Sequence, residues 1–270
     1  MKALKEILIK NEWFTRQEIE NLFTSEIQEC INECTRPNQS DIFNAFDGLR
    51  PQDVKVLIIG QDPYPDEAKA HGLAFSYNNG EIPAEDSLLN IFRKISEDVG
   101  IDNSYTNLSA WKKQGVLLLN TALTFAPNNQ DFHIKAWHNF VNHVISKLLE
   151  VKTTNKQPLV VMLWGAKANE IKSLAYKGNQ QGADYRTVIL RNQAARHILC
   201  TAHRREDYQE KYPLVKILRS SHPSNNYQAC TKSICDGEVP AFKDTDFRPF
   251  KECNEFLQTH NVEVINWQTA

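Results

Sequence analysis

A short polar segment that directly follows an apolar run carries the residues best suited to chemistry. The run Lys55–Ile59 is rich in aliphatic residues and is followed by Gly60-Gln61-Asp62-Pro63-Tyr64. In open α/β sheets, ligands bind beyond the carboxyl ends of the strands. Asp62 would therefore stand where such a fold places its chemistry, with an amide before it and an aromatic ring after it.

Strand-like and helix-like runs alternate along the rest of the chain. Strands are predicted at Val54–Gly60, Val116–Thr121, Leu159–Trp164 and Val215–Arg219, and the helices between them include Leu88–Asp98 and Trp137–Leu149. Alternation of this kind predicts βαβ units and a parallel central sheet. Ser87 is expected to cap the first of these helices.

Length and composition suit one large α/β domain. The chain has 270 residues, of which 41% are hydrophobic, enough for a core. No apolar run approaches the roughly 18 residues that span a membrane, and the charged N-terminus lacks the apolar stretch of a signal peptide. We therefore expect a cytoplasmic protein without a membrane segment.

The cysteines do not predict a metal site. Neither the Cys30/Cys34 spacing nor the Cys230/Cys235 spacing forms a convincing ligand set. In a cytoplasmic chain, cysteines are expected to remain free thiols. We expect neither a metal nor a cofactor.

Charge is distributed unevenly. The net charge of −2 on its own disfavours a nucleic-acid-binding protein. Residues 178–235, however, include nine Lys or Arg and four Asp or Glu, so this stretch carries about +5 and the remainder about −7. The stretch is either a solvated insertion of mixed charge or a patch that attracts phosphates.

Five motifs in collinear order resemble family 1 uracil-DNA glycosylases. The similar segments are Gly60-Gln61-Asp62-Pro63-Tyr64 with His71-Gly72-Leu73-Ala74-Phe75-Ser76, then Val116–Thr121, Leu163-Trp164-Gly165, His222-Pro223-Ser224 and Ile265-Asn266-Trp267. The resemblance implies a single α/β domain over residues 1–270, with a central four-stranded parallel sheet flanked by helices. Loop insertions are expected near 177–212 and 228–246.

The resemblance also implies a reaction, hydrolysis of the uracil–deoxyribose bond, and roles for named residues. The base must leave the helical stack before its bond can be reached. Asp62 would position or activate the attacking water, and His222 would donate a hydrogen bond to uracil O2. A competing histidine, His203, also ends a strand-like run. Pro223 and Ser224 favour His222, because two arginines follow His203.

Four residues are expected to recognise the base. Asn120 would read the uracil edge, and Phe75 would stack on the flipped ring. Tyr64 would collide with the methyl group of thymine, and Gln61 would contribute a backbone donor. The residues expected to contact DNA are Ser87, Gly165, Ser224 and Tyr227.

Several positions depart from the family pattern. Pro65 stands where the family has a histidine that assists the phosphate side of the site, and Ala166 replaces a serine. Glu85 and Asp86 replace two prolines and would repel a DNA phosphate. The expected leucine wedge is absent, and Tyr227 is its candidate replacement. We therefore expect a preference for uracil in single-stranded DNA.

Three alternatives remain at this point. The chain could act on another modified pyrimidine, or it could be a glycosylase-like DNA-binding module without activity. A nucleotide-binding doubly wound protein is a third alternative, but no Gly-rich phosphate loop supports it. The expected partner is uracil-containing DNA and the expected state is a monomer; whether a protein inhibitor or repair partners bind is left open.

Overall fold

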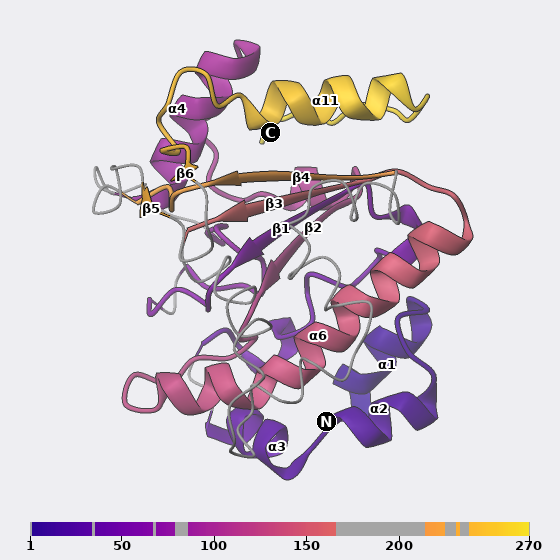
Figure 1. Cartoon of the computed structure of the whole chain (residues 1–270). Helices are drawn as coiled ribbons and strands as arrows, with labels where there is room; N and C mark the ends of the chain where they lie inside the picture. Colours follow the sequence, from indigo (N-terminus) through magenta and orange to yellow (C-terminus); the bar gives the residue numbers. More distant parts are fainter. Residues whose placement is uncertain are drawn as a thin grey trace.

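A four-stranded parallel sheet lies at the centre of the molecule (Figure 1). The computed structural model describes residues 2–33, 36–66, 69–78, 86–165, 214–224, 231–232 and 238–269. The sheet has the order β2-β1-β3-β4, and its strands are β1 (Val56–Gly60), β2 (Val116–Asn120), β3 (Leu159–Trp164) and β4 (Val215–Ser220). The predicted strands are confirmed to within two residues at each end.

The strand register brings the carboxyl ends of the strands to one edge. Gly60 pairs with Asn120 across β1 and β2, and Trp164 pairs with Ser220 across β3 and β4. Every residue of β1, β2 and β3 is buried. Both faces of the sheet are therefore covered, which explains why these strands read as unbroken apolar runs.

Helices cover the two faces of the sheet (Figure 1). The long helix α6 (Gln130–Thr154) lies on one side with α1 (Lys2–Lys10), α2 (Arg16–Leu22) and α3 (Ser25–Glu33). On the other side lie α4 (Ser87–Val99) and α11 (Pro249–Thr259). Shorter elements are η1 (Gln39–Asp41), η2 (Pro51–Asp53) and α5 (Ser109–Lys112). Apolar side chains from the strands and both helical layers form one core cluster.

The start of α4 corrects one prediction. Asp86, not Ser87, is the N-cap, because its carboxylate accepts a hydrogen bond from the backbone N–H of Leu88 at 2.8 Å. Aspartate ranks with serine as a capping residue, so composition alone does not choose between the neighbours. The predicted helix Leu88–Asp98 is confirmed, and α6 extends well beyond the predicted Trp137–Leu149.

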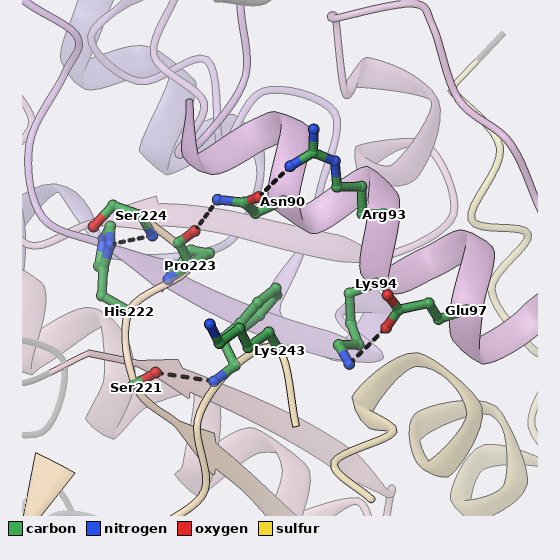
Figure 2. A pocket seen from close by; sticks show the side chains of 10 residues that line it. Asn90, Arg93, Lys94, Glu97, Ser221, His222, Pro223, Ser224 and Lys243 are labelled. Carbon is green, nitrogen blue, oxygen red and sulfur yellow. Dashed lines mark hydrogen bonds and ion pairs between the residues drawn. The ribbon is translucent and has the colours of Figure 1, made fainter. Parts of the chain in front are cut away.

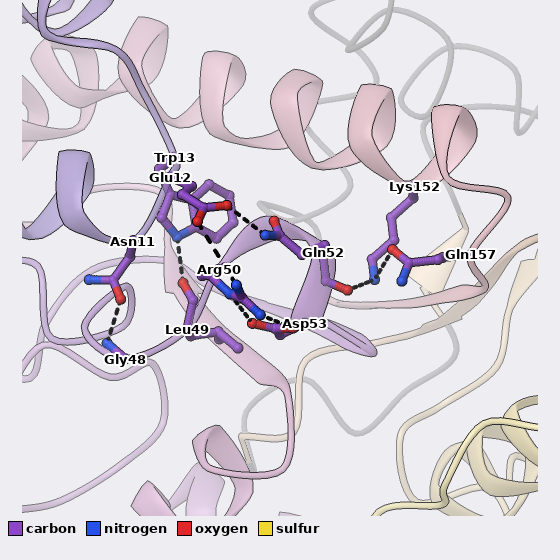
Figure 3. A network of polar contacts seen from close by, with 10 residues as sticks. All are labelled: Asn11, Glu12, Trp13, Gly48, Leu49, Arg50, Gln52, Asp53, Lys152 and Gln157. Carbon is purple, nitrogen blue, oxygen red and sulfur yellow. Dashed lines mark hydrogen bonds and ion pairs between the residues drawn. The ribbon is translucent and has the colours of Figure 1, made fainter.

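A polar network ties the N-terminal segment and α6 to the amino end of β1 (Figure 3). The indole Nε1 of Trp13 donates to the carbonyl of Leu49 at 2.7 Å, and Nζ of Lys152 donates to the carbonyl of Gln52 at 2.8 Å. Both side chains are buried. Their donors satisfy main-chain carbonyls that would otherwise lose hydration, so this network fixes the approach to β1.

The two predicted insertions are only partly described. The region 177–212 lies outside the described residues, and so do His203 and Tyr227. Within 228–246, β5 (Thr231–Lys232) and β6 (Glu238–Val239) pair in antiparallel fashion. Among the described residues, no helix is long and apolar enough to cross a membrane, and no group of three or more His, Cys, Asp or Glu is placed to hold a metal ion.

Candidate active site

The carboxyl ends of β1 and β2 are fastened together by hydrogen bonds from Thr121 to main-chain carbonyls. Thr121 N–H donates to the Gly60 carbonyl at 3.0 Å, and its hydroxyl donates to the Gln61 carbonyl at 2.7 Å. A Cβ on Gly60 would lie 2.3 Å from Oδ1 of Asn120. Only glycine therefore allows the buried Asn120 amide to lie against β1, directly beside the Gln61–Asp62 segment.

Asp62 is half-buried and is held by a residue distant in sequence. Its Oδ2 accepts a hydrogen bond from Nε2 of Gln130, the first residue of α6. The sequence did not single out Gln130. Its local pattern is that of an ordinary polar helix start, and nothing local shows that this helix begins beside the end of β1.

The loop that carries Phe75 is fixed by a buried serine and histidine. Ser76 Oγ accepts the backbone N–H of Leu108 at 2.9 Å and lies 2.7 Å from Nε2 of His71. Burial lowers the pKa of His71 to about 4, so the ring is neutral at pH 7. Phe75 itself has a φ of 60°, a left-handed conformation that is uncommon for a residue other than glycine.

Phe75 lies against residues from the ends of the other two strands. The centroid of its ring is 5.5 Å from that of Trp164 and 6.1 Å from that of His222. Gly165 follows β3 with a φ of 93°, and a Cβ there would lie 2.7 Å from Cβ of His222. A left-handed glycine thus lets the histidine approach the end of β3. The structure brings together the predicted residues Phe75, Gly165 and His222.

The hydrogen bonding of His222 assigns its tautomer (Figure 2). The backbone N–H of Ser224 donates to Nδ1 of His222 at 3.1 Å. A nitrogen that accepts a hydrogen bond carries no proton, and burial lowers the pKa of this imidazole. His222 is therefore a neutral ring with its proton on Nε2. That nitrogen is suited to donate to an oxygen on which negative charge develops.

A pocket of about 160 Å³ borders the same segment on the side of α4 (Figure 2). Its lining includes Arg93, Lys94 and Lys243 along with Glu97. Nδ2 of Asn90 donates to the Pro223 carbonyl at 2.6 Å. The histidine segment is therefore fastened to α4 as well as to β3.

Tyr64 is held by Asp86, a residue that was expected from the sequence to face DNA. Its hydroxyl lies 3.4 Å from Asp86 Oδ1, and its ring meets that of Tyr77 edge-on at 4.6 Å. Tyr77 donates its own hydroxyl to Asp86 Oδ2. Burial, followed by the charge of Asp86, raises the pKa of Tyr64. Asp86 thus caps α4 and anchors two phenols, a role different from the expected repulsion of phosphate. Glu85 lies outside the described residues.

The remaining predicted contacts are placed as follows. Ser87 and Ser224 are partly exposed, at the start of α4 and after His222. The carbonyl of the exposed Pro65 accepts a hydrogen bond from Nε of Arg36 at 2.8 Å. Ala166, like Tyr227 and His203, lies outside the described residues.

Comparison with known proteins assigns the chain to a family. Residues 46–258 match the family model described as the uracil DNA glycosylase superfamily. The chain belongs to this superfamily. A uracil-DNA glycosylase from Exiguobacterium sibiricum is 43% identical over 236 residues, covering 86% of this chain and 83% of the relative. Another from Desulfitobacterium hafniense is 32% identical over 274 residues, covering 97% of each chain.

Solved structures agree on the fold. The crystal structure of mimivirus uracil-DNA glycosylase superposes with a TM-score of 0.65 at 23% sequence identity, covering 95% of this chain and 88% of that one. The predicted fold, a parallel four-stranded sheet flanked by helices, is confirmed. Membership of the superfamily makes the chain a DNA-repair glycosylase, a hydrolase of N-glycosyl bonds.

Proposed function

We propose that the protein flips uracil out of DNA, hydrolyses its N-glycosidic bond through Asp62 and His222, and leaves an abasic site. Cleavage of this bond places negative charge on the departing base. The tautomer of His222 carries the proposal, because a neutral imidazole with its proton on Nε2 donates to uracil O2 as that charge develops. A donor held in place before the reaction stabilises the transition state without reorganising.

Asp62 supplies the opposite charge. The sugar becomes cationic as the base departs, and a carboxylate close to it offsets this charge and orients the attacking water. Support comes from its position after β1, at the carboxyl edge of a parallel sheet.

Base selection follows from three side chains around the same edge. The Asn120 amide pairs with O4 and N3–H of uracil, whereas cytosine presents the reverse pattern. Phe75 stacks on the flipped ring, and the Gln61 backbone adds a donor. Tyr64 lies against C5, where its ring excludes a methyl group. The bonds of Tyr64 to Asp86 and its packing on Tyr77 support a gate that does not move aside easily.

DNA contacts are assigned to Ser87, Gly165, Ser224 and Tyr227. Extracting a base from a duplex costs a few kcal/mol of unpairing and unstacking, which a single strand largely avoids. The family's leucine wedge is replaced in this sequence by Asn225-Asn226-Tyr227. We expect single-stranded uracil to be cut fastest, then U·G pairs, then U·A pairs.

The proposed setting is a monomer of one catalytic domain that acts in the cytoplasm on uracil-containing DNA. A variant of the mimivirus enzyme has been solved in complex with UGI. Binding of UGI to this chain is a direct test of whether it shares a protein inhibitor.

One substrate panel tests the proposed function. Oligonucleotides of identical sequence would carry uracil, thymine or 5-hydroxymethyluracil, each as a single strand and as a duplex, with Asp62→Asn protein as the control. We expect release of uracil and no measurable release of thymine. Faster release of 5-hydroxymethyluracil than of uracil would favour the modified-pyrimidine alternative. Binding without release of any base would favour a DNA-binding module.

A further inference from the structure

We infer that Gln130 is a positioning residue for Asp62, holding one carboxylate oxygen so that the other faces the attacking water. The inference rests on the proposed role of Asp62. The observation behind it is the hydrogen bond from Nε2 of Gln130 to Oδ2 of Asp62, which joins the start of α6 to the end of β1. An amide that donates to one oxygen fixes the rotation of the carboxylate.

Buried hydrogen bonds hold the start of α6 in place, and they therefore fix the position of the Gln130 backbone. Oγ1 of Thr124 accepts the indole N–H of Trp137 at 2.6 Å and lies 2.7 Å from Nδ1 of His133. All three side chains are fully buried. This chain of hydrogen bonds fastens the first two turns of α6 to the segment after β2.

The same arrangement favours the ionised form of Asp62. The amide of Gln130 is a neutral donor, so it stabilises the carboxylate without cancelling the negative charge that the sugar cation requires. The amino end of the 25-residue helix α6 adds a positive partial charge in the same place. Pro65, three residues after Asp62, has neither a side-chain nor a backbone donor to serve instead.

Two substitutions separate positioning from packing. Gln130→Leu keeps the approximate shape and removes the donor; Gln130→Glu places a second carboxylate beside Asp62. Uracil release from a single-stranded oligonucleotide would be followed across a range of pH. For Gln130→Leu we expect kcat to fall about tenfold with KM unchanged, since a hydrogen bond to a charged group is lost. The acid limb of the profile should move to higher pH, and further still for Gln130→Glu.

The matched control is Asn129→Ala. The Asn129 side chain donates to Glu33 at 3.2 Å, not to Asp62, so this variant should keep the wild-type rate and profile. The double variant Asp62→Asn/Gln130→Leu should be no slower than Asp62→Asn alone, because Gln130 acts through Asp62. Circular dichroism would check folding, and Gln130→Met and Gln130→Glu serve if Gln130→Leu does not fold.

The possible outcomes separate the proposed role of Asp62 from the inferred role of Gln130. Wild-type turnover in Asp62→Asn would overturn the role of Asp62 itself. A slow Asp62→Asn beside a wild-type-like Gln130→Leu would overturn only the inference on Gln130. A slower Gln130→Leu with an unmoved acid limb, additive with Asp62→Asn, would show a purely structural role and would also overturn it.

Discussion

The two ends of the parallel sheet use buried polar groups in different ways. At the amino end, buried donors finish on main-chain carbonyls, as in the bonds of Trp13 to Leu49 and of Lys152 to Gln52 (Figure 3). At the carboxyl end, main-chain carbonyls also accept hydrogen bonds, but so do two titratable side chains: Asp62 accepts from Gln130, and His222 accepts from the backbone of Ser224. The amino end fixes where segments run, and the carboxyl end fixes which atoms carry protons.

The difference follows from what each partner can do. A carbonyl accepts a hydrogen bond but cannot change its charge near neutral pH, so the bonds of Trp13 and Lys152 to carbonyls contribute to stability. A carboxylate or an imidazole can change its protonation, and a partner bond biases which form is populated. Substitutions at the carboxyl end should therefore alter rates, whereas substitutions at the amino end should alter unfolding.

The largest effect is expected for Asp62→Asn. The variant keeps the shape of the side chain and removes its charge, so cleavage should slow by about 100-fold to 10,000-fold, as for loss of a general base. Single-turnover kinetics on uracil-containing single strands would measure it. DNA affinity and thermal unfolding should change little. An equal loss of DNA binding would mean that Asp62 acts on the substrate complex and not on the chemical step.

His222→Ala should come next. Removing one preorganised donor costs roughly 2.7 to 4 kcal/mol of transition-state stabilisation. The wild-type imidazole should stay neutral at pH 6.5, because burial lowers its pKa, and nitrogen NMR should find the proton on Nε2. His203→Ala is the matched control and should behave like wild type. The reverse pattern would assign the role to His203.

Much of this site could be predicted because its residues follow local signals. Apolar runs locate the strands, and β3 matches its predicted limits residue for residue. Asp62 and Asn120 stand at strand ends, which parallel strands bring together at one edge. Where they lie therefore follows from the pattern of the strands alone.

Contacts between distant segments could not be predicted in this way. Gln130 and Asp62 are 68 residues apart, and Asn90 and Pro223 are 133 apart, so neither bond leaves a periodic trace in the sequence. The prediction that Ser87 caps α4 was wrong for another reason. Asp86 and its neighbour Ser87 are both good caps, and the predicted choice took no account of Tyr77, whose hydroxyl also donates to Asp86.

Lys152→Met tests the amino end. Burial lowers the pKa of Lys152 to about 8, so between pH 8 and its ordinary 10.5 the unfolded chain binds more protons than the folded chain. Lys152 should therefore make the unfolding free energy rise with pH across this window, by about 1 kcal/mol per pH unit. Urea unfolding at several pH values should show that the stability difference between wild type and Lys152→Met changes with pH by this amount, whereas the difference between wild type and the exposed control Lys10→Met stays constant.

Activity completes that test. Lys152→Met should cleave uracil at pH 7 within about twofold of wild type, because the residues of the amino-end network in Figure 3 include none of the proposed site residues. A tenfold loss of kcat in folded Lys152→Met protein would show that the amino end of the sheet also affects catalysis.

The smallest effect is expected for Asp86, which combines both kinds of role. Asp86→Ala removes the cap of α4, which typically costs about 1 kcal/mol of stability. It also removes the acceptor shared by Tyr64 and Tyr77. Asp86→Asn should retain most of the cap, because asparagine caps as well as aspartate, but it replaces the charge with an amide. Ser87→Ala should leave stability unchanged, since Asp86 is the cap.

Discrimination between uracil and thymine then tests whether Asp86 also holds the Tyr64 ring in place. A Tyr64 ring without its acceptor should leave more room beside C5, so Asp86→Ala should release a little thymine, less than Tyr64→Ala. Single-turnover assays on matched thymine and uracil oligonucleotides would measure the ratio. If Asp86→Ala is destabilised but still rejects thymine completely, the carboxylate only caps α4, and packing against Tyr77 alone holds the gate. If Asp86→Ala releases thymine, the bonds from Asp86 to the two tyrosines contribute to base selection. Asp86 would then belong with the residues that affect catalysis, although its backbone position is that of a helix cap.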